Sequence, residues 1–311
     1  MKNDSPSRTA LWVTFLRAAA DASPDINLFP DPIAKLFLPK TLKRLATSAL
    51  FHRLMKFASF RIQRTERLRK VRPYWALLAE ILMRARFAED LLQQRIEEGV
   101  TQYIILGAGL DSFVFRYPEL LSRVHVYELD HPASQAHKLS LIQRAGLTVP
   151  EGVTYLPIDF EKSSVSEVLS QSNFDPNQAT LICWNGVSYY LTKSAVKALF
   201  LDLAEYCGDK VEIVFDYADG KFFQTKPVTW RQKIFEGSLR FGREPLLTGF
   251  YLQELEQLIQ HCGFELVKNV PGKEQDALFS PQERGILFSN WNTHFAHIRG
   301  IDANTQRQVG S

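Results

Sequence analysis

The sequence has little cysteine, little net charge and no long apolar run. Its three cysteines, Cys183, Cys207 and Cys262, show no paired spacing, which argues against a disulfide framework or a zinc site and predicts reduced thiols in a cytoplasmic protein. No apolar run is long enough to span a membrane, and the first residues contain no signal-peptide core. The net charge of +3 over 311 residues is small, whereas a nucleic-acid-binding protein is normally more basic. We therefore expect no metal site, no nucleic-acid partner and no membrane span.

Short apolar runs alternate with helical patterns along most of the chain, which is 45% hydrophobic and 23% charged. Such alternation is typical of βαβ units and predicts an α/β fold with a parallel sheet. Two further runs complete a doubly wound, mostly parallel, seven-stranded, Rossmann-like sheet. The expected strands are 103–106, 124–127, 153–158, 180–184, 211–215, 264–267 and 285–289.

The sequence predicts three regions around this sheet. Residues 1–99 read as a helical cap that lies over the carboxyl ends of the strands, where ligands bind in such sheets. Residues 100–291 read as the core, with 219–248 inserted as a lid, and 292–311 as a polar tail. Cap and core are expected to form one structural domain.

The most informative stretch begins with an apolar strand that ends in Gly107-Ala108-Gly109. Glycines at this position let the chain turn sharply and let a ligand approach the backbone. The next strand ends in Glu128-Leu129-Asp130. An acid about twenty residues after the glycines can accept hydrogen bonds from both hydroxyls of a ribose. Together, the turn and the acid predict a nucleoside-binding crevice, although glycine turns also occur without a ligand.

A third glycine, which dinucleotide sites normally have, is missing here. Leu110, Asp111 and Ser112 follow Gly109 directly, so the pyrophosphate cradle is incomplete. This favours a nucleoside without phosphates, of which S-adenosylmethionine is the commonest, over a nicotinamide cofactor and its reductase chemistry. Calorimetry with S-adenosylmethionine and with a nicotinamide cofactor would show which of the two binds.

Several blocks in order resemble the leucine carboxyl methyltransferase family, which includes protein phosphatase methyltransferases and many bacterial small-molecule O-methyltransferases. The resemblance covers about 61–216 and implies a class I S-adenosylmethionine-dependent methyltransferase. Its blocks are Arg84-Ala85-Arg86, the stretch from Leu106 to Asp111, Glu128-Leu-Asp-His-Pro132, Pro157-Ile-Asp159-Phe160, and the stretch from Trp184 to Leu191.

The resemblance implies a role for individual positions in holding the cofactor. Arg86 would bind the methionine carboxylate, unless it pairs with an acid on its own helix, and Gly107 would admit the methionine part. Asp130 would take the ribose hydroxyls, with Glu128 as the fallback, while Asp159 and Phe160 would bracket the adenine. The cofactor-binding set is Arg86, Gly107, Ala108, Gly109, Asp111, Glu128, Asp130, Asp159, Phe160 and Asn185.

The sequence departs from the family at Asn185, where many members carry a glutamate. An amide can still bond the cofactor's amino group, but it cannot act as a base, which weakens a transfer of the phosphatase function. A carboxylate acceptor needs no base, whereas a hydroxyl usually does. Tyr189, Tyr190 and His131 are possible helpers, although packing is the favoured explanation for each, and no catalytic residue is assigned.

Aromatic side chains in the insertion point to an apolar small-molecule acceptor, such as a polyketide or fatty acid derivative. They line pockets for apolar ligands, but they could also anchor the insertion to the core. Methylation of a protein C-terminus, and a non-catalytic nucleoside-binding regulator, remain alternatives. The basic segment 61–72 is interpreted as a solvated helix face in preference to an anion-binding surface. The aromatics are Phe222, Phe223, Trp230, Phe235 and Phe241.

Overall fold

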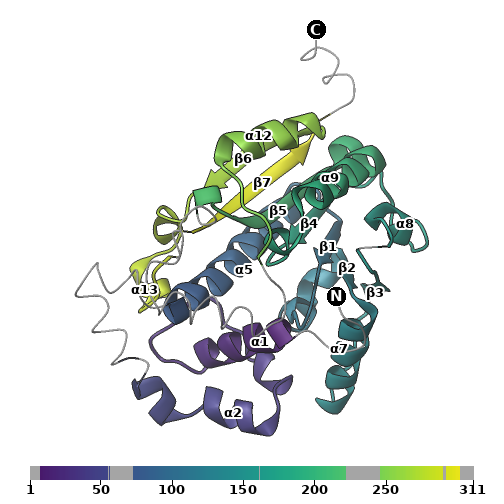
Figure 1. Ribbon diagram of the computed structural model, residues 1–311. Coiled ribbons are helices and arrows are strands. Elements are labelled where there is room, and N and C mark those ends of the chain that lie inside the picture. Colours follow the sequence, from purple (N-terminus) through teal and green to yellow (C-terminus); the bar gives the residue numbers. More distant parts are fainter. Residues whose placement is uncertain are drawn as a thin grey trace.

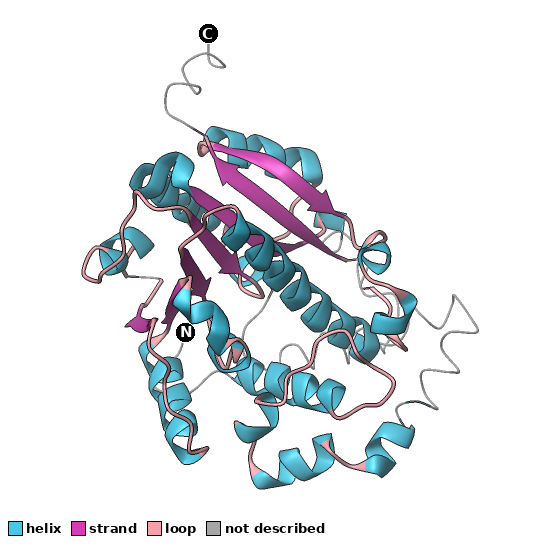
Figure 2. Cartoon of the chain, turned by 180° about the vertical axis from the view of Figure 1, so that it is seen from behind, coloured by secondary structure: helices cyan, strands magenta, loops and turns pink. Residues whose placement is uncertain are grey.

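The computed structural model of the chain describes residues 8–54, 56, 73–160, 162–221, 246–289 and 292–301. Its centre is a seven-stranded sheet in the order β3-β2-β1-β4-β5-β7-β6, with helices on both sides (Figures 1 and 2). The strands are β1 (Gln102–Leu106), β2 (His125–Asp130), β3 (Val153–Pro157), β4 (Thr180–Trp184), β5 (Val211–Ala218), β6 (Phe264–Val270) and β7 (Thr293–Gly300).

The helices fall into a cap before the sheet and connections between its strands. Those before the sheet are α1 (Arg8–Asp21), η1 (Ala34–Leu36), α2 (Lys40–Ala46) and α5 (Pro73–Glu97). The others are α6 (Phe113–Arg116), η2 (Pro118–Ser122), α7 (Pro132–Arg144), α8 (Val165–Leu169), η3 (Ser188–Tyr190), α9 (Lys193–Cys207), η4 (Gly208–Lys210), α12 (Leu252–His261), η5 (Gln275–Leu278) and α13 (Pro281–Arg284).

Alternate residues of the strands point to opposite faces, and both faces are buried. On β1, Ile104 and Leu106 join the core beneath α8, α9 and α12. Tyr103 and Ile105 join the core beneath α5 and α6. Burial on both faces explains why this strand reads as an unbroken apolar run. The predicted α/β, doubly wound, mostly parallel sheet is confirmed: β1 to β5 are parallel and β7 is antiparallel to both neighbours.

The prediction of the last strand was wrong. Residues 285–289 are not a strand, and Leu287 and Phe288 pack instead on the cap cluster with α1 and α5. The seventh strand is β7, inside the region expected to be a tail. Histidines interrupt the apolar pattern of this strand, so the sequence does not look like a buried strand. In the structure, His297 is buried between β5 and β6, and its Nε2 lies 2.5 Å from the Glu212 carboxylate.

The predicted lid lies almost wholly outside the described residues, including its aromatics Phe222, Phe223, Trp230, Phe235 and Phe241. Its described ends are joined, since the Gly220 amide donates to the Phe250 carbonyl at 3.0 Å. The Leu247 amide donates to the Tyr189 carbonyl at 2.7 Å. The insertion therefore leaves and returns at the carboxyl end of β5.

Candidate functional site

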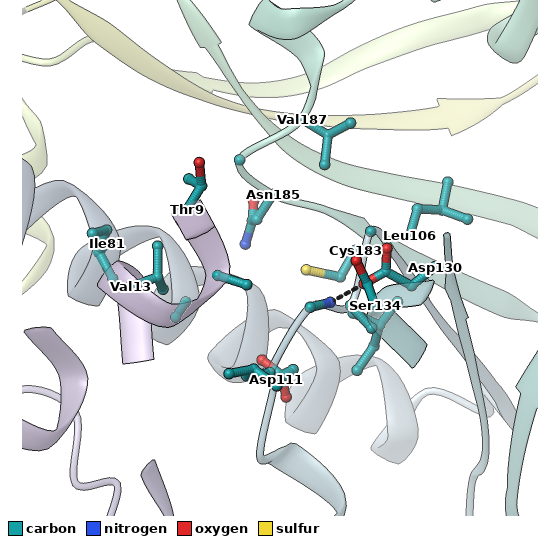
Figure 3. Close-up of a pocket in the computed structure, with 18 of the residues that line it drawn as sticks. Thr9, Val13, Ile81, Leu106, Asp111, Asp130, Ser134, Cys183, Asn185 and Val187 are labelled. Atoms are coloured by element: carbon teal, nitrogen blue, oxygen red, sulfur yellow. Dashed lines mark hydrogen bonds between the residues drawn. The ribbon is translucent and has the colours of Figure 1, made fainter. Parts of the chain in front are cut away.

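A cavity of about 830 Å³ lies where α1 and α5 meet the carboxyl ends of β1, β2 and β4. Figure 3 shows Thr9 and Val13 of α1 on one side of it and Asp130 on the other. The edge of the sheet is where parallel strands bind ligands. The cap helices and the strand ends thus line one space.

The glycine turn has no room for a side chain at Gly107 and little at Gly109. Gly107 has φ +68° and Gly109 has φ +53°, a left-handed backbone that disfavours other residues. A Cβ on Gly107 would lie 2.7 Å from Cγ2 of Val187, and one on Gly109 would lie 3.2 Å from Cβ of Ala10. Both glycines and Ala108 line the cavity, so a ligand can lie against bare backbone here.

Asp130 ends β2 with its carboxylate at the cavity. The amides of Gly109 and His131 both donate to it, the latter at 2.6 Å. Burial raises the pKa of Asp130, against the lowering effect of these two bonds. The carboxylate is thus fixed beside the glycine turn, and its remaining lone pairs can accept from a diol.

Glu128, the predicted fallback for Asp130, does not line the cavity. It is fully buried and forms an ion pair with Lys138 of α7. Burial raises the pKa of Glu128 to about 7 in spite of the Lys138 ammonium. Glu128 is therefore not needed as an alternative acceptor for the ribose, because β2 continues to Asp130.

Three more predicted residues line the cavity. Asp159 and Phe160 follow β3, and Asn185 follows β4. Oδ2 of Asp159 lies 2.8 Å from the exposed Lys162 ammonium. The Asn185 amide donates to the Arg84 carbonyl at 3.2 Å and lies in the space between α1 and the strand ends (Figure 3). With Gly107 after β1 and Asp130 at the end of β2, the structure thus brings together residues from the carboxyl ends of four neighbouring strands.

The structure does not bring Arg86 to the cavity, which corrects its predicted role. Its Nε donates to Asp90 at 2.6 Å, Nη1 donates to the Leu28 carbonyl at 3.1 Å, and Nη2 lies 3.4 Å from Glu283. Pairing with an acid on its own helix was the alternative that the sequence left open. Arg86 ties α5 to the cap at Leu28 and to α13 at Glu283.

Arg84 occupies the cavity wall instead. Its Nη1 donates to Asp216 of β5 at 2.8 Å and to the Tyr189 hydroxyl at 2.9 Å, and lies 3.7 Å from Glu80. Burial disfavours the charge, yet Asp216, Tyr189 and Glu80 raise the pKa of Arg84 well above its ordinary value. A permanent guanidinium therefore faces the cavity, with a fork that suits a carboxylate.

Helical spacing explains which arginine faces inward. The cavity-lining residues of α5 fall three or four positions apart, which places them on one side of a helix. Arg86 lies two positions beyond Arg84, about 200° around the axis. The apolar lining residues of α5 recur at spacings of three or four positions, and Arg84 continues this pattern whereas Arg86 does not. The sequence pattern would therefore have selected Arg84. The lining residues of α5 are Leu77, Ile81, Arg84, Ala85, Ala88 and Glu89.

A buried charge network holds α1 against the glycine turn. Arg17 of α1 contacts Asp31 at 2.7 Å and Asp111 at 3.1 Å. Arg116 of α6 pairs with Glu89 of α5. Burial of Asp111 opposes ionisation, but the Arg17 and Arg116 guanidinium groups lower its pKa to about 2. Asp111, one of the predicted cofactor-binding residues, lines the cavity, and its contact with Arg17 holds α1 in place.

Tyr189, Tyr190 and His131, the possible helpers, all line the cavity. Burial raises the pKa of Tyr189 well above its ordinary value, and His131 Nδ1 accepts from the Ala133 amide at 3.3 Å as the cap of α7. Burial likewise raises the pKa of the Cys183 thiol to about 12. None of these contacts identifies a base.

Within the described ranges, no three acidic, histidine or cysteine side chains gather as a metal site, and no helix could span a membrane.

The donors and acceptors at the cavity fit S-adenosylmethionine. Its amino acid part carries a carboxylate, for which Arg84 is a partner. Its ribose offers two hydroxyls, for which Asp130 is an acceptor, and bare backbone at Gly107 lets it lie close. The residues that line the cavity therefore offer partners for the carboxylate and the ribose of this group.

Comparison with known proteins finds a matching family and similar bacterial proteins. A family model described as leucine carboxyl methyltransferase matches residues 10–204. A Bacillus subtilis (strain 168) protein named "Putative S-adenosyl-L-methionine-dependent methyltransferase YktD" is 30% identical over 305 residues, which cover 96% of this chain and 99% of that one. A similarly named protein of Mycolicibacterium vanbaalenii is 28% identical, over 70% of this chain and 68% of its own.

Among solved structures, the chain is similar to the glycopeptide N-methyltransferase MtfA in complex with S-adenosyl-L-methionine. The TM-score is 0.43 and the identity 11%, over 68% of this chain and 93% of that one.

Proposed function

We propose that this chain, which belongs to the leucine carboxyl methyltransferase family, methylates a carboxylate or hydroxyl oxygen of an apolar small molecule. It is an S-adenosyl-L-methionine-dependent methyltransferase with the class I fold. The observation that carries the proposal is the apolar end of the cavity, beside the residues that suit the cofactor.

The two ends of the cavity differ in chemistry. The sheet end presents backbone, Asp130 and Asp159, whereas the helix end presents mostly aliphatic side chains. A volume of about 830 Å³ lies near the upper end of the roughly 300–1,000 Å³ of small-molecule pockets, so space remains beside a nucleoside. The helix end is lined by Leu11, Val13, Leu16, Leu42, Leu77, Ile81 and Ala85.

We assign the cofactor contacts to residues of both the sheet and α5. Arg84 would bind the methionine carboxylate, and Asn185 the amino group. Asp130 would accept from the ribose, and Asp159 and Phe160 would hold the adenine. When bound, the cofactor supplies a methyl group activated by a sulfonium. The chain then mainly has to align donor and acceptor and exclude water.

A carboxylate acceptor suits this cavity best. The acids among its described lining residues other than Asp130 and Asp159 are Glu89 and Asp111, and both are held in ion pairs. Asn185 cannot take a proton. A carboxylate is already ionised at neutral pH, and its oxygen can accept the methyl group without a base. A hydroxyl acceptor would need help from Tyr189, Tyr190 or His131.

Transfer of a labelled methyl group from the cofactor tests this proposal across fatty acids, aromatic acids, phenols and a phosphatase C-terminal peptide. We expect label on an apolar acid, lost in Arg84→Lys and retained in Arg86→Lys. Label on the peptide alone would overturn the small-molecule proposal and favour methylation of a protein C-terminus.

We also propose that the protein works in the cytoplasm. Cys183, Cys207 and Cys262 are all buried free thiols, which is typical of a reducing compartment. Recovery of the native protein from a fractionated cell would test this.

A further inference from the structure

One face of the cap exposes leucines and a tryptophan beside basic side chains. Leu50, Leu54 and Trp12 are 65%, 60% and 54% exposed, the three highest values for large apolar side chains in the part of the chain that the structure describes. Large exposed apolar groups that lie together mark interaction sites. We call this the basic apolar face; it comprises Trp12, Lys40, Lys43, Arg44, Leu45, Leu50, Arg53, Leu54 and Lys56.

Aromatic contacts join the two parts of this face. The rings of Trp12 and Phe15 lie 5.2 Å apart, and those of Phe15 and Phe51 lie 6.0 Å apart. Phe51 belongs to the helical stretch that carries Leu50 and Leu54, which are four positions apart and so share one side of the helix. Figure 1 shows α1 and α2 lying together at one end of the molecule. A row of aromatic rings with Phe15 buried at its centre therefore connects Trp12 with the helical stretch that carries Leu50 and Leu54.

The charges of this face have one sign. Residues 40–56 contain five lysines and arginines and no acid, and all five are exposed. Among the described residues, only Lys56 of the five has an ion-pair partner, Asp25 at 2.6 Å. The sequence continues in this way to residue 72, so that 40–72 holds eleven lysines and arginines and one acid, Glu66. The whole chain carries only +3, so the basic charge is concentrated here.

We propose that the basic apolar face docks on an anionic phospholipid bilayer surface. Exposed leucine and tryptophan side chains beside lysine and arginine are the combination that such an interface binds. An acidic protein partner would match the charge, but it would leave leucines without an apolar layer to enter. The proposal goes beyond the methyl-transfer function and does not depend on it.

The cavity adjoins this face. Trp12 both lines the cavity and belongs to the face, and α2 contributes Leu42 to the cavity and Leu45 to the face. An apolar acceptor dissolved in a bilayer would therefore reach the cavity past α1 and α2. Docking would then place the enzyme at the bilayer that holds its acceptor.

Co-sedimentation with vesicles tests the proposal. The full chain should bind vesicles of equal phosphatidylglycerol and phosphatidylcholine, and binding should fall steeply as salt is raised, because screening shortens the reach of the charges. The double variant Arg44→Glu with Leu50→Ser should bind at least about 30-fold more weakly, since each basic residue near such a surface contributes about fivefold. Leu201→Ser with Lys210→Glu, a matched pair on α9 and η4, should bind as the parent does.

Melting temperature and cofactor affinity of both double variants establish that each is folded. Equal binding to phosphatidylcholine alone, or equal loss in both double variants, would overturn the proposal. A dimer in size-exclusion chromatography that Arg44→Glu with Leu50→Ser dissociates, with no vesicle binding by the parent, would assign the face to a second copy instead.

Discussion

The Arg17 guanidinium of α1 lies 3.1 Å from the Asp111 carboxylate, two residues beyond the glycine turn of the core. The same side chain donates to Ser112 at 3.1 Å and contacts Asp31 at 2.7 Å. Arg17 and Asp31 are almost fully buried, and water screens buried charges little. This contact makes the cap a wall of the cavity and supports the expectation that cap and core form one domain.

Arg17→Met should therefore destabilise the protein strongly. Removing one partner of a buried pair leaves uncompensated charge on Asp31 and Asp111, and typically costs about 3–5 kcal/mol. Urea unfolding measures this loss. Arg123→Met is the control, because Arg123 pairs with Glu97 at the surface, where ion pairs contribute little. Equal loss in both variants would show that the network is not what holds α1.

Arg84→Lys should weaken cofactor binding while Arg86→Lys leaves it unchanged. Lysine keeps the charge beside Asp216 but loses the planar fork, and a charged hydrogen bond contributes about 1.5–3 kcal/mol. Isothermal titration calorimetry with S-adenosylmethionine and its demethylated product should show a tenfold or larger rise in the dissociation constant for Arg84→Lys. A rise for Arg86→Lys alone would restore the role expected from the sequence.

Gly107→Ala should impair cofactor binding, whereas Gly146→Ala should affect only stability. Both glycines have φ +68°, so alanine costs each about 1–2 kcal/mol of backbone strain. A Cβ on Gly146 meets nothing within 4 Å, while one on Gly107 meets Val187 at 2.7 Å and enters the cavity wall. Thermal melts and calorimetry on the pair separate strain from obstruction. Unimpaired cofactor binding by Gly107→Ala would contradict the close approach.

Glu128 should make stability depend on pH. Burial raises the pKa of Glu128 to about 7, above the ~4.3 of an unfolded chain. The folded state therefore binds the proton more tightly between these values, and the stability from this group is present below about pH 4 and lost as pH rises through 7. Relative to Glu128→Gln, the parent should lose on the order of 3 kcal/mol over that window. Urea unfolding at several pH values measures it, and parallel curves would refute it.

Local patterns in the sequence were enough to select many of the residues that line the candidate site. The strand before Gly107, the turn itself and the acids Asp130 and Asp159 lie next to one another in the chain or at strand ends, and parallel strands bring their carboxyl ends to one edge. Their convergence at the cavity follows from the alternation of strands and helices. Asn185 was found in the same way, because it follows the fourth strand.

Tertiary packing decided what these patterns left open. Arg84 and Arg86 differ only in their direction around α5, which is fixed by the side of the helix that packs on the sheet. β7 pairs between β5 and β6 although its sequence contains two histidines and an arginine, because Glu212 of β5 lies beside His297 and Arg299. The sequence determines local backbone and the order of elements by itself, whereas burial of charged side chains depends on partners distant in the chain, which only the folded structure brings together.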